Sequence, residues 1–338
     1  MTLIGNGDIQ YVILSNEFDF TEATFADLKQ FDNVEYYRFP INTNSEILKK
    51  AYIIHGSQKA NSLIRLPGQD LWNSLQFDPN GLDPNKSVCF IYSFRRIDRL
   101  IRSGFFDYVK TMYPNVYHVA YWDDLVKENQ KNALEYAKAH FDLVFTYDEQ
   151  EAARYCIRYY PSFYSRIKLP EDNDNDIRYD ICFVGNAKDR LSEILEAYDA
   201  LASGGCRCRF VVNGVNSGNM KRLPMVEYNN PMPYRAVIEL VLASRCILEI
   251  NQRGASGQSL RVNEAAVYRR KLLSNNPNIR KLPQFNEENM RVYDRCITES
   301  DIEFVKSGDN FEASYDVDLI SPIRFLETID GILGGRDE

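Results

Sequence analysis

The stretch CILEINQRGASGQSLRVNEAAVYRRKLLSNN, residues 246–276, joins a strand, a glycine-containing loop, a helix and a second strand in immediate succession. The runs CILEIN (246–251) and KLLSNN (271–276) are apolar enough for buried strands, and SLRVNEAAVYR (259–269) between them has helical periodicity. A strand, a helix and a strand in this order form a right-handed crossover between parallel strands. The stretch therefore predicts a parallel sheet covered by helices.

The same alternation extends along the rest of the chain. In the second half we expect further strands at 178–185 and 208–214, and helices at 190–205 and 234–245. In the first half, apolar runs rich in β-branched and aromatic residues predict strands at 11–15, 51–56, 87–94, 115–122 and 141–147. Helices are predicted there at 123–140 and 149–160. Both halves therefore predict doubly wound α/β sheets.

We place the domain boundary near residues 165–177, because the segment 161–180 contains two prolines and the acidic run EDNDND. We predict a first domain at residues 1–170, a second at 178–318, and a C-terminal helix at 319–338 that packs back on the first domain. The predicted fold class is α/β, with two Rossmann-like domains in tandem and a central cleft between them. Ligands of such sheets bind at the carboxyl ends of the strands.

Charge and composition exclude several classes of protein. Forty Lys and Arg residues against 48 Asp and Glu give a net charge of −8, which argues against a general nucleic-acid binder. Seven cysteines, without a CxxC pair, are expected to be reduced thiols of a cytoplasmic protein. We expect neither a signal peptide nor a membrane-spanning segment, because nowhere do 18 apolar residues run together.

The segment RRIDRLIRSGFFDYVK, residues 95–110, combines basic and aromatic side chains. Two interpretations remain open from the sequence. The segment forms either a peripheral contact with the inner membrane surface or a partly exposed amphipathic helix.

The loop and helix start at residues 257–264 form a candidate anion site. Gly257, Gln258 and Ser259 precede the helix, whose free N–H groups attract anions. Arg261 offers a planar fork to phosphate oxygens, and Glu264 is close enough to accept hydrogen bonds from sugar hydroxyls of a nucleotide. The alternative is that Ser259 and its neighbours merely cap the helix and that the arginine is solvated.

A second candidate is FVGNAKDR, residues 183–190. A strand that ends at Gly185 and is followed by Lys188 and Arg190 is typical of half of a phosphate-binding turn. The full GxGxxG fingerprint is missing, and any β–α turn can carry these residue types. The turn is expected to face the Gly257 loop across the sheet.

Three segments together resemble a known family. They are YDICFVGNAKDR, YRAVIELVLASRCILEINQRGASGQSLRVNEA and KLLSNN, and upstream VYHVAYWDD and FDLVFTYDEQEAARYCIRYYPSFY are similar as well. The pattern resembles bacterial cell-surface polysaccharide glycosyltransferases, which act in capsule, O-antigen and lipopolysaccharide assembly. The resemblance covers roughly residues 115–285.

The resemblance implies a GT-B fold without an obligatory metal or cofactor. The second domain would hold a nucleotide-sugar co-substrate, a UDP-sugar in this interpretation, and the first a growing, lipid-linked glycan acceptor. It assigns the ribose to Glu264, the diphosphate to Gly257, Gln258 and Ser259, and the phosphate charge to Lys188 and Arg190. Retaining members often carry a Glu seven positions before the ribose Glu. Gly257 stands there instead, which favours inversion.

An inverting transferase needs a base near the acceptor hydroxyl. Asp123 and Asp124 follow a predicted strand and lie near the expected cleft, and His118 lies on that strand. The alternatives are an N-cap for the aspartates and a core position for the histidine.

The sequence thus predicts a cytoplasmic, hexosyltransferase-like enzyme, with peripheral contact at the inner face of the membrane. The alternative function is a non-catalytic nucleotide-binding or scaffold subunit of a polysaccharide assembly complex.

Overall fold

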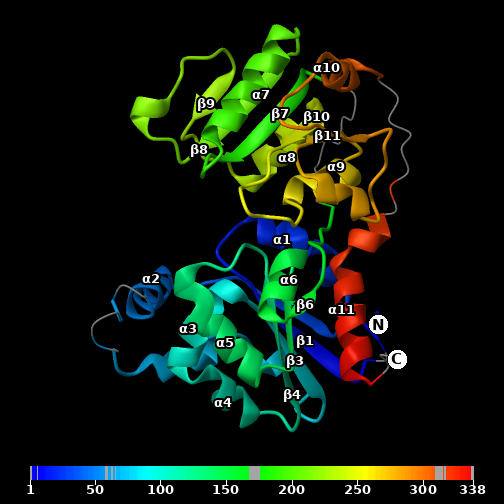
Figure 1. Cartoon of the computed structure of the whole chain (residues 1–338). Coiled ribbons are helices and arrows are strands. Elements are labelled where there is room, and N and C mark those ends of the chain that lie inside the picture. The colour runs from blue at the N-terminus through cyan, green and yellow to red at the C-terminus, as the bar shows by residue number, and fades with distance from the viewer. Residues whose placement is uncertain are drawn as a thin grey trace. The chain divides into compact units, whose positions relative to one another are not determined.

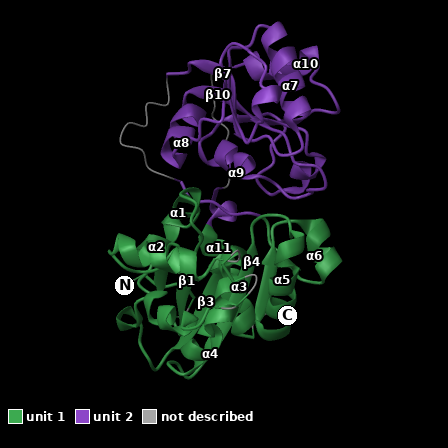
Figure 2. Cartoon of the chain, turned by 90° about the vertical axis from the view of Figure 1, so that its left-hand side faces the viewer, with its two compact units in different colours: residues 1–161, 322–338 green, residues 162–321 purple. Residues whose placement is uncertain are grey.

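The computed structural model describes residues 2–5, 7–57, 60–61, 64, 66–166, 176–308, 315 and 317–335. The chain divides into two compact units, and Figure 2 shows them in separate colours. Unit 1 comprises residues 1–161 and 322–338, and unit 2 comprises residues 162–321. Each unit contains a six-stranded sheet in which every neighbouring pair of strands is parallel. The predicted α/β fold class is confirmed.

The sheet of unit 1 has the strand order β2-β1-β3-β4-β5-β6. Its strands are β1 (Ile9–Leu14), β2 (Val34–Tyr37), β3 (Ser87–Ser93), β4 (Val116–Trp122), β5 (Leu143–Thr146) and β6 (Arg158–Tyr159). The chain builds outward from β1 to β2 and then returns to place β3 on the other side of β1. At such a reversal the loops that follow the two strands diverge and leave a crevice at the carboxyl edge.

The helices of unit 1 are α1 (Phe20–Thr24), α2 (Glu46–His55), α3 (Phe94–Ser103), α4 (Phe105–Lys110), α5 (Lys131–His140), α6 (Glu149–Tyr155) and α11 (Pro322–Leu333). Short 3₁₀ helices lie at Ala26–Gln30, Gln69–Leu75, Pro79–Gly81 and Glu128–Gln130. The helix α3 starts at the residue after β3, so that its apolar positions Ile97 and Leu100 are buried beside Trp122 and Leu134. Its position relative to the carboxyl edge is therefore fixed by the core.

One predicted strand in unit 1 is wrong, and two predicted helices are shorter than expected. The expected strand at 51–56 is the second half of α2, which Ser45 caps by accepting a hydrogen bond from the Leu48 N–H at 3.3 Å. The expected helix at 123–140 begins only with the 3₁₀ turn at Glu128. The expected helix at 149–160 ends at Tyr155 because Cys156 adopts a left-handed conformation, and β6 follows.

The sheet of unit 2 has the order β12-β11-β10-β7-β8-β9, with its reversal between β7 and β10. Its strands are β7 (Tyr179–Asn186), β8 (Cys208–Asn213), β9 (Val226–Tyr228), β10 (Ser244–Glu249), β11 (Lys271–Ser274) and β12 (Met290–Val292). Its helices are α7 (Leu191–Ser203), α8 (Tyr234–Leu242), α9 (Leu260–Val267) and α10 (Glu299–Lys306), with 3₁₀ turns at Ser217–Asn219, Pro277–Lys281 and Val317–Ile320. In unit 2, β9, β12 and α10 were not predicted from the sequence.

The helix α11 packs on the sheet of unit 1 although it follows all of unit 2 in the sequence (Figure 1). The ring of Phe325 lies 5.3 Å from Tyr121 and from Phe145, and 4.9 Å from Tyr160, measured between ring centroids. On the same helix, Asp330 accepts a hydrogen bond from the Tyr11 hydroxyl of β1 at 2.9 Å. Residues 322–333 thus complete the core of unit 1.

All seven cysteines are free thiols, and five of them are buried. Burial raises the pKa of the Cys89 and Cys246 thiols well above its ordinary value. Among the described residues, no helix has the length and the apolar composition needed to cross a bilayer.

Replacing Phe325 by Ala should destabilise unit 1 by about 3–5 kcal/mol, because the fully buried ring leaves a cavity between α11 and the sheet. Chemical denaturation followed by circular dichroism measures this change. Glu327→Ala is the matched control, since Glu327 is an exposed residue of the same helix. Equal stability of the two variants would show that α11 is not part of the unit 1 core.

Candidate functional site

The two turns that the sequence singled out in unit 2 lie together at the carboxyl edge of its sheet. The strands β7 and β10 are parallel neighbours, so the loops that follow them leave the same edge. Lys188 Nζ donates to Gln252 Oε1 at 2.5 Å, and the Arg190 guanidinium donates to the Ile250 carbonyl. The prediction that residues 183–190 face the loop before α9 is confirmed by these contacts.

The turn after β7 is cationic. Lys188 is exposed, whereas Arg190 is partly buried beside Glu249. Burial lowers the pKa of Arg190, and the charge of Glu249 opposes that change. A Cβ on Gly185 would approach the Phe183 ring at 3.2 Å and the Arg190 guanidinium at 3.7 Å. Glycine at this position therefore leaves room for the Phe183 ring.

The loop between β10 and α9 is held by asparagine side chains that the sequence analysis did not select. Asn251 Nδ2 donates to the carbonyls of Ala255 and Gly257, at 3.1 Å each. Asn276 Nδ2 donates to the Gly257 carbonyl at 3.1 Å as well. Two amides thus converge on the carbonyl that precedes the start of α9 and fix the conformation of Gly257.

The start of α9 is capped from within the protein. Ser259 Oγ accepts a hydrogen bond from the Arg261 N–H at 3.2 Å, and Glu249 Oε1 accepts one from the Ser259 N–H at 2.9 Å. Glu249 is almost fully buried, and Ser274 Oγ donates to its other oxygen at 2.6 Å. Ser259 therefore caps the helix, as in the alternative interpretation of the sequence. Glu249 already places a negative charge at the start of α9, so an anion bound there would add a second one.

Gln258 is directed into unit 2. Its Nε2 donates to the Ser162 carbonyl at 3.1 Å and to Asn263 Oδ1 at 3.2 Å. The residue is 4% exposed, and its Oε1 is buried with no hydrogen-bond partner among the described residues. In this conformation Gln258 links α9 to the segment at Ser162.

Glu264 is fully buried in a network of hydroxyl groups. Its Oε2 forms an ion pair with Arg261, and its Oε1 accepts a hydrogen bond from the Tyr234 hydroxyl at 2.5 Å. The Tyr164 hydroxyl lies 2.9 Å from that of Tyr234 and 3.1 Å from that of Tyr268. Burial and the nearby Glu264 charge raise the pKa of Tyr234 well above its usual value, which keeps this hydroxyl protonated as a donor.

This network affects the predicted roles of Arg261 and Glu264. A carboxylate can bind sugar hydroxyls only from an accessible position, and here both oxygens are engaged inside unit 2. Ligand contact at Glu264 thus requires the Arg261 or Tyr234 contact to open. The sequence pattern could not reveal Tyr234 as a partner, because it lies thirty positions before Glu264.

In unit 1, Asp123 and Asp124 follow β4 directly. Asp124 forms ion pairs with Arg95 and Lys127, at 3.4 Å each, and accepts a hydrogen bond from the Leu125 N–H. Asp123 is reached by solvent, and its Oδ2 accepts a 3.4 Å hydrogen bond from Asn16. Desolvation by the protein around it raises the pKa of Asp123 to about 6, although the Arg95 charge opposes this shift.

His118 is a core residue. It is 2% exposed, and its ring packs against Phe106 and Phe141. Nδ1 lies 2.9 Å from the Tyr92 hydroxyl, and burial lowers the pKa of His118 to about 4. A catalytic base must be reached by substrate, and His118 is buried away from the carboxyl edge of the sheet. His118 therefore takes the core position that was the alternative prediction. In the part of the chain that the structure describes, no group of three or more His, Cys, Asp or Glu side chains is placed to hold a metal ion.

Comparison with known proteins gives matches in structure alone. No family model matches the chain, and no curated protein matches its sequence. The Anabaena protein HepE, solved in complex with UDP and glucose, aligns with a TM-score of 0.51 at 8% identity, over 96% of this chain and 100% of HepE. An alpha-glucosyltransferase solved with UDP and a mismatched DNA aligns with a TM-score of 0.50 at 10% identity, over 94% of each chain.

The chain has the GT-B fold. Both alignments extend across the two Rossmann-like units, so the likeness covers the whole fold. In a GT-B chain the carboxyl edges of the two sheets are the places to look for ligands, and the candidate residues other than His118 follow strands at those edges.

Replacing Glu264 by Gln should destabilise unit 2 by about 3 kcal/mol, because the change leaves the Arg261 charge without its buried partner. Urea unfolding of wild type and variant tests this expectation. Glu239→Gln, which removes one partner of an exposed pair with Arg235 on α8, should change stability by less than about 1 kcal/mol. A Glu264→Gln protein as stable as wild type would remove the ion pair from the architecture of unit 2.

Proposed function

We propose that this chain is a glycosyltransferase that moves a sugar, a hexose in our interpretation, from a UDP-sugar to a growing cell-surface glycan. One observation carries the proposal. In unit 2, the cationic turn at Lys188 and Arg190 meets the loop before α9 at the carboxyl edge of the sheet, where the strand order reverses. Ligands of open α/β sheets bind at this place, and a diphosphate suits its charge.

The donor diphosphate would bind between these two segments. Lys188 and Arg190 would offset its negative charge, and the N–H groups at the start of α9 would add partial positive charge from the helix. Because Glu249 already accepts from the Ser259 N–H, the cations are needed to make the site attractive to an anion. The complexes of HepE and the alpha-glucosyltransferase with UDP support a uridine donor.

We propose an inverting, metal-independent reaction. An acceptor hydroxyl attacks the anomeric carbon, a base takes the hydroxyl proton, and the bond from that carbon to the UDP oxygen breaks. Asp123 is the proposed base, because solvent reaches it and a pKa of about 6 leaves it ionised near neutral pH. Asp124 would position the turn through Arg95 and Lys127. Lys188 and Arg190 would stabilise the charge that develops on the leaving UDP.

The biological setting that we propose follows from the sequence resemblance. It is polysaccharide synthesis of the capsule or lipopolysaccharide type, on a lipid-linked acceptor, in the cytoplasm at the inner face of the membrane. The net charge of −8 supports a partner other than nucleic acid.

A second candidate is a non-catalytic nucleotide-binding or scaffold subunit of a polysaccharide assembly complex. Two observations favour it. Gly257 carries no acidic group towards a donor sugar, and the Glu264 carboxylate is enclosed by Arg261 and Tyr234. Nucleotide binding without sugar transfer would decide for this candidate.

Lys188→Ala should weaken UDP binding about tenfold, the effect of losing roughly 1.4 kcal/mol of charge interaction. Isothermal titration calorimetry with UDP, with and without EDTA, measures the affinity and any metal requirement. Lys306→Ala is the control, because Lys306 donates to the Gly204 carbonyl, which precedes β8 at the opposite edge of the sheet. If wild-type protein does not bind UDP, or both variants bind it as wild type does, the donor site is wrong.

Asp123→Asn should lower the rate of sugar transfer by about 10²–10⁴-fold and leave the UDP affinity unchanged, because it removes the proposed base. In wild type, kcat/KM should rise with pH through about 6 and then level off, since Asp123 accepts a proton only when ionised. Transfer assays across pH with a radiolabelled donor measure both the rate of the variant and the pH dependence of kcat/KM. Normal turnover by the Asn variant would exclude Asp123 as the base.

A further inference from the structure

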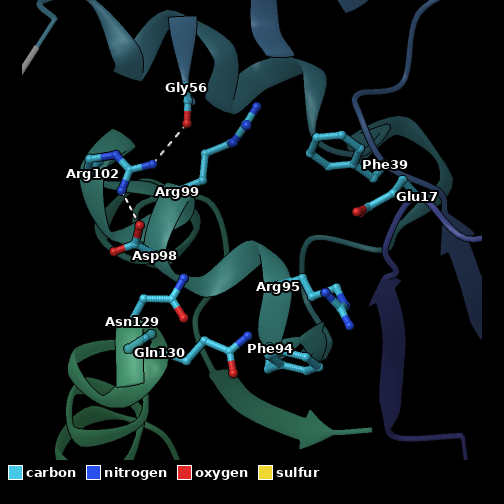
Figure 3. A pocket seen from close by; sticks show the side chains of 11 residues that line it. Glu17, Phe39, Gly56, Phe94, Arg95, Asp98, Arg99, Arg102, Asn129 and Gln130 are labelled. Carbon is cyan, nitrogen blue, oxygen red and sulfur yellow. Dashed lines mark hydrogen bonds and ion pairs between the residues drawn. The ribbon is translucent and has the colours of Figure 1, made fainter. Parts of the chain in front are cut away.

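Unit 1 contains a pocket of about 260 Å³ at the carboxyl edge of its own sheet. Its walls come from residues that follow four neighbouring strands: Glu17 after β1, Phe39 after β2, Arg95 after β3 and Asn129 after β4. The pocket therefore lies where the strand order of unit 1 reverses, the place at which such sheets bind ligands. Figure 3 shows its lining side chains around the open space.

One face of α3 supplies three arginines to this pocket. Arg95, Arg99 and Arg102 are spaced by four and three positions and all line it. Arg102 pairs with Asp98, and Arg95 lies 3.4 Å from Asp124. These two charges are offset within the protein.

Arg99 differs from its two neighbours. Its guanidinium donates to the carbonyls of Tyr52 and Ile53, at 3.0 and 3.5 Å, and lies 5.1 Å from the centre of the Phe39 ring. Over the residues that the structure describes, no carboxylate forms an ion pair with it. Burial lowers the pKa of Arg99, and the charge of Glu17 in the same pocket offsets that change only in part. An anion bound beside Arg99 would offset more of the lost hydration.

Two further features add positive potential at the same place. Behind the pocket, Arg96 is 1% exposed and bonds to carbonyl and amide oxygens, with no carboxylate partner in the described ranges. The first turn of α3 also starts at the pocket wall, and Ser93 makes no side-chain cap bond to it. Uncapped N–H groups at a helix start attract anions. The guanidinium groups of Arg99 and Arg96 and the start of α3 thus act together.

We infer that the acceptor carries an oxyanion, a phosphate or a uronate carboxylate, which binds in this pocket beside Arg99 and the first turn of α3. The inference rests on the proposed function, because it names the chemistry of that reaction's acceptor. Complete ligand pockets have volumes of about 300–1,000 Å³. A pocket of about 260 Å³ therefore takes one charged sugar unit or one phosphate group of the acceptor.

The test uses the full chain and three probes: glucose 1-phosphate, glucuronate and glucose. Calorimetric titrations with UDP present at saturation keep the donor site of unit 2 occupied. The phosphate or the carboxylate probe should bind and neutral glucose should not, and the tighter of the two charged probes identifies the source of the oxyanion.

Substitutions then locate the site. Arg99→Gln should weaken binding of the charged probe about tenfold, whereas Asp98→Asn should strengthen it because a competing carboxylate is removed. A gain of affinity cannot arise from misfolding. Arg324→Gln on α11 is the matched control, since Arg324 is exposed and pairs with Glu327.

Chemical modification gives a readout that needs no variant. Phenylglyoxal modification of Arg99, followed by peptide mass spectrometry, should be slowed by the charged probe, while modification of Arg324 is unchanged. Equal binding of charged and neutral probes, or an unchanged affinity in Arg99→Gln, would overturn the inference. If UDP fails to bind but the charged probe binds through Arg99, the proposed function fails and the anion site stands. If UDP binds but the charged probe does not, the proposed transferase function stands and the inference of an anionic acceptor is wrong.

Discussion

The buried guanidinium of Arg96 organises the carboxyl edge of the first sheet. It donates to the carbonyl of Ser15, which follows β1, and to Gln76 Oε1, which precedes β3. It also donates to the carbonyls of Tyr37, the last residue of β2, and of Pro40, three residues later. Burial lowers the pKa of Arg96, because the charged guanidinium loses its hydration. The hydrogen bonds to these oxygens offset that loss of hydration free energy. One side chain thereby fixes three segments, and both the Asp123 turn and the arginine-lined pocket lie next to them.

Strands that are buried on both faces could be predicted from the sequence, because they are continuous apolar runs flanked by turns. The prediction at 178–185 matches β7 for this reason. The run at 51–56 is as apolar, but it is one half of a helix whose polar half lies upstream, and short apolar runs fit either state. The three-residue strands β9 and β12 carry too few residues for a period to emerge.

Only part of the candidate site could be predicted from the sequence. Turns that follow parallel strands must meet at one edge, so the pairing of Lys188 and Gln252 could be anticipated from topology. The partners of Glu264 could not, because Tyr234 lies within an apolar helix and its hydroxyl is positioned by tertiary packing. Glu249 did offer a signal: a carboxylate at the end of an otherwise apolar strand must find donors when it is buried.

The return of α11 to unit 1 has a consequence for biosynthesis. The whole of unit 2 leaves the ribosome before Phe325 does, so unit 2 can fold while the sheet of unit 1 still lacks the helix that covers part of it. Until then, Phe145 and Tyr121 lack the contact with the Phe325 ring that they make in the folded unit. The nascent chain therefore passes through an interval in which this part of the unit 1 sheet is not yet covered by α11.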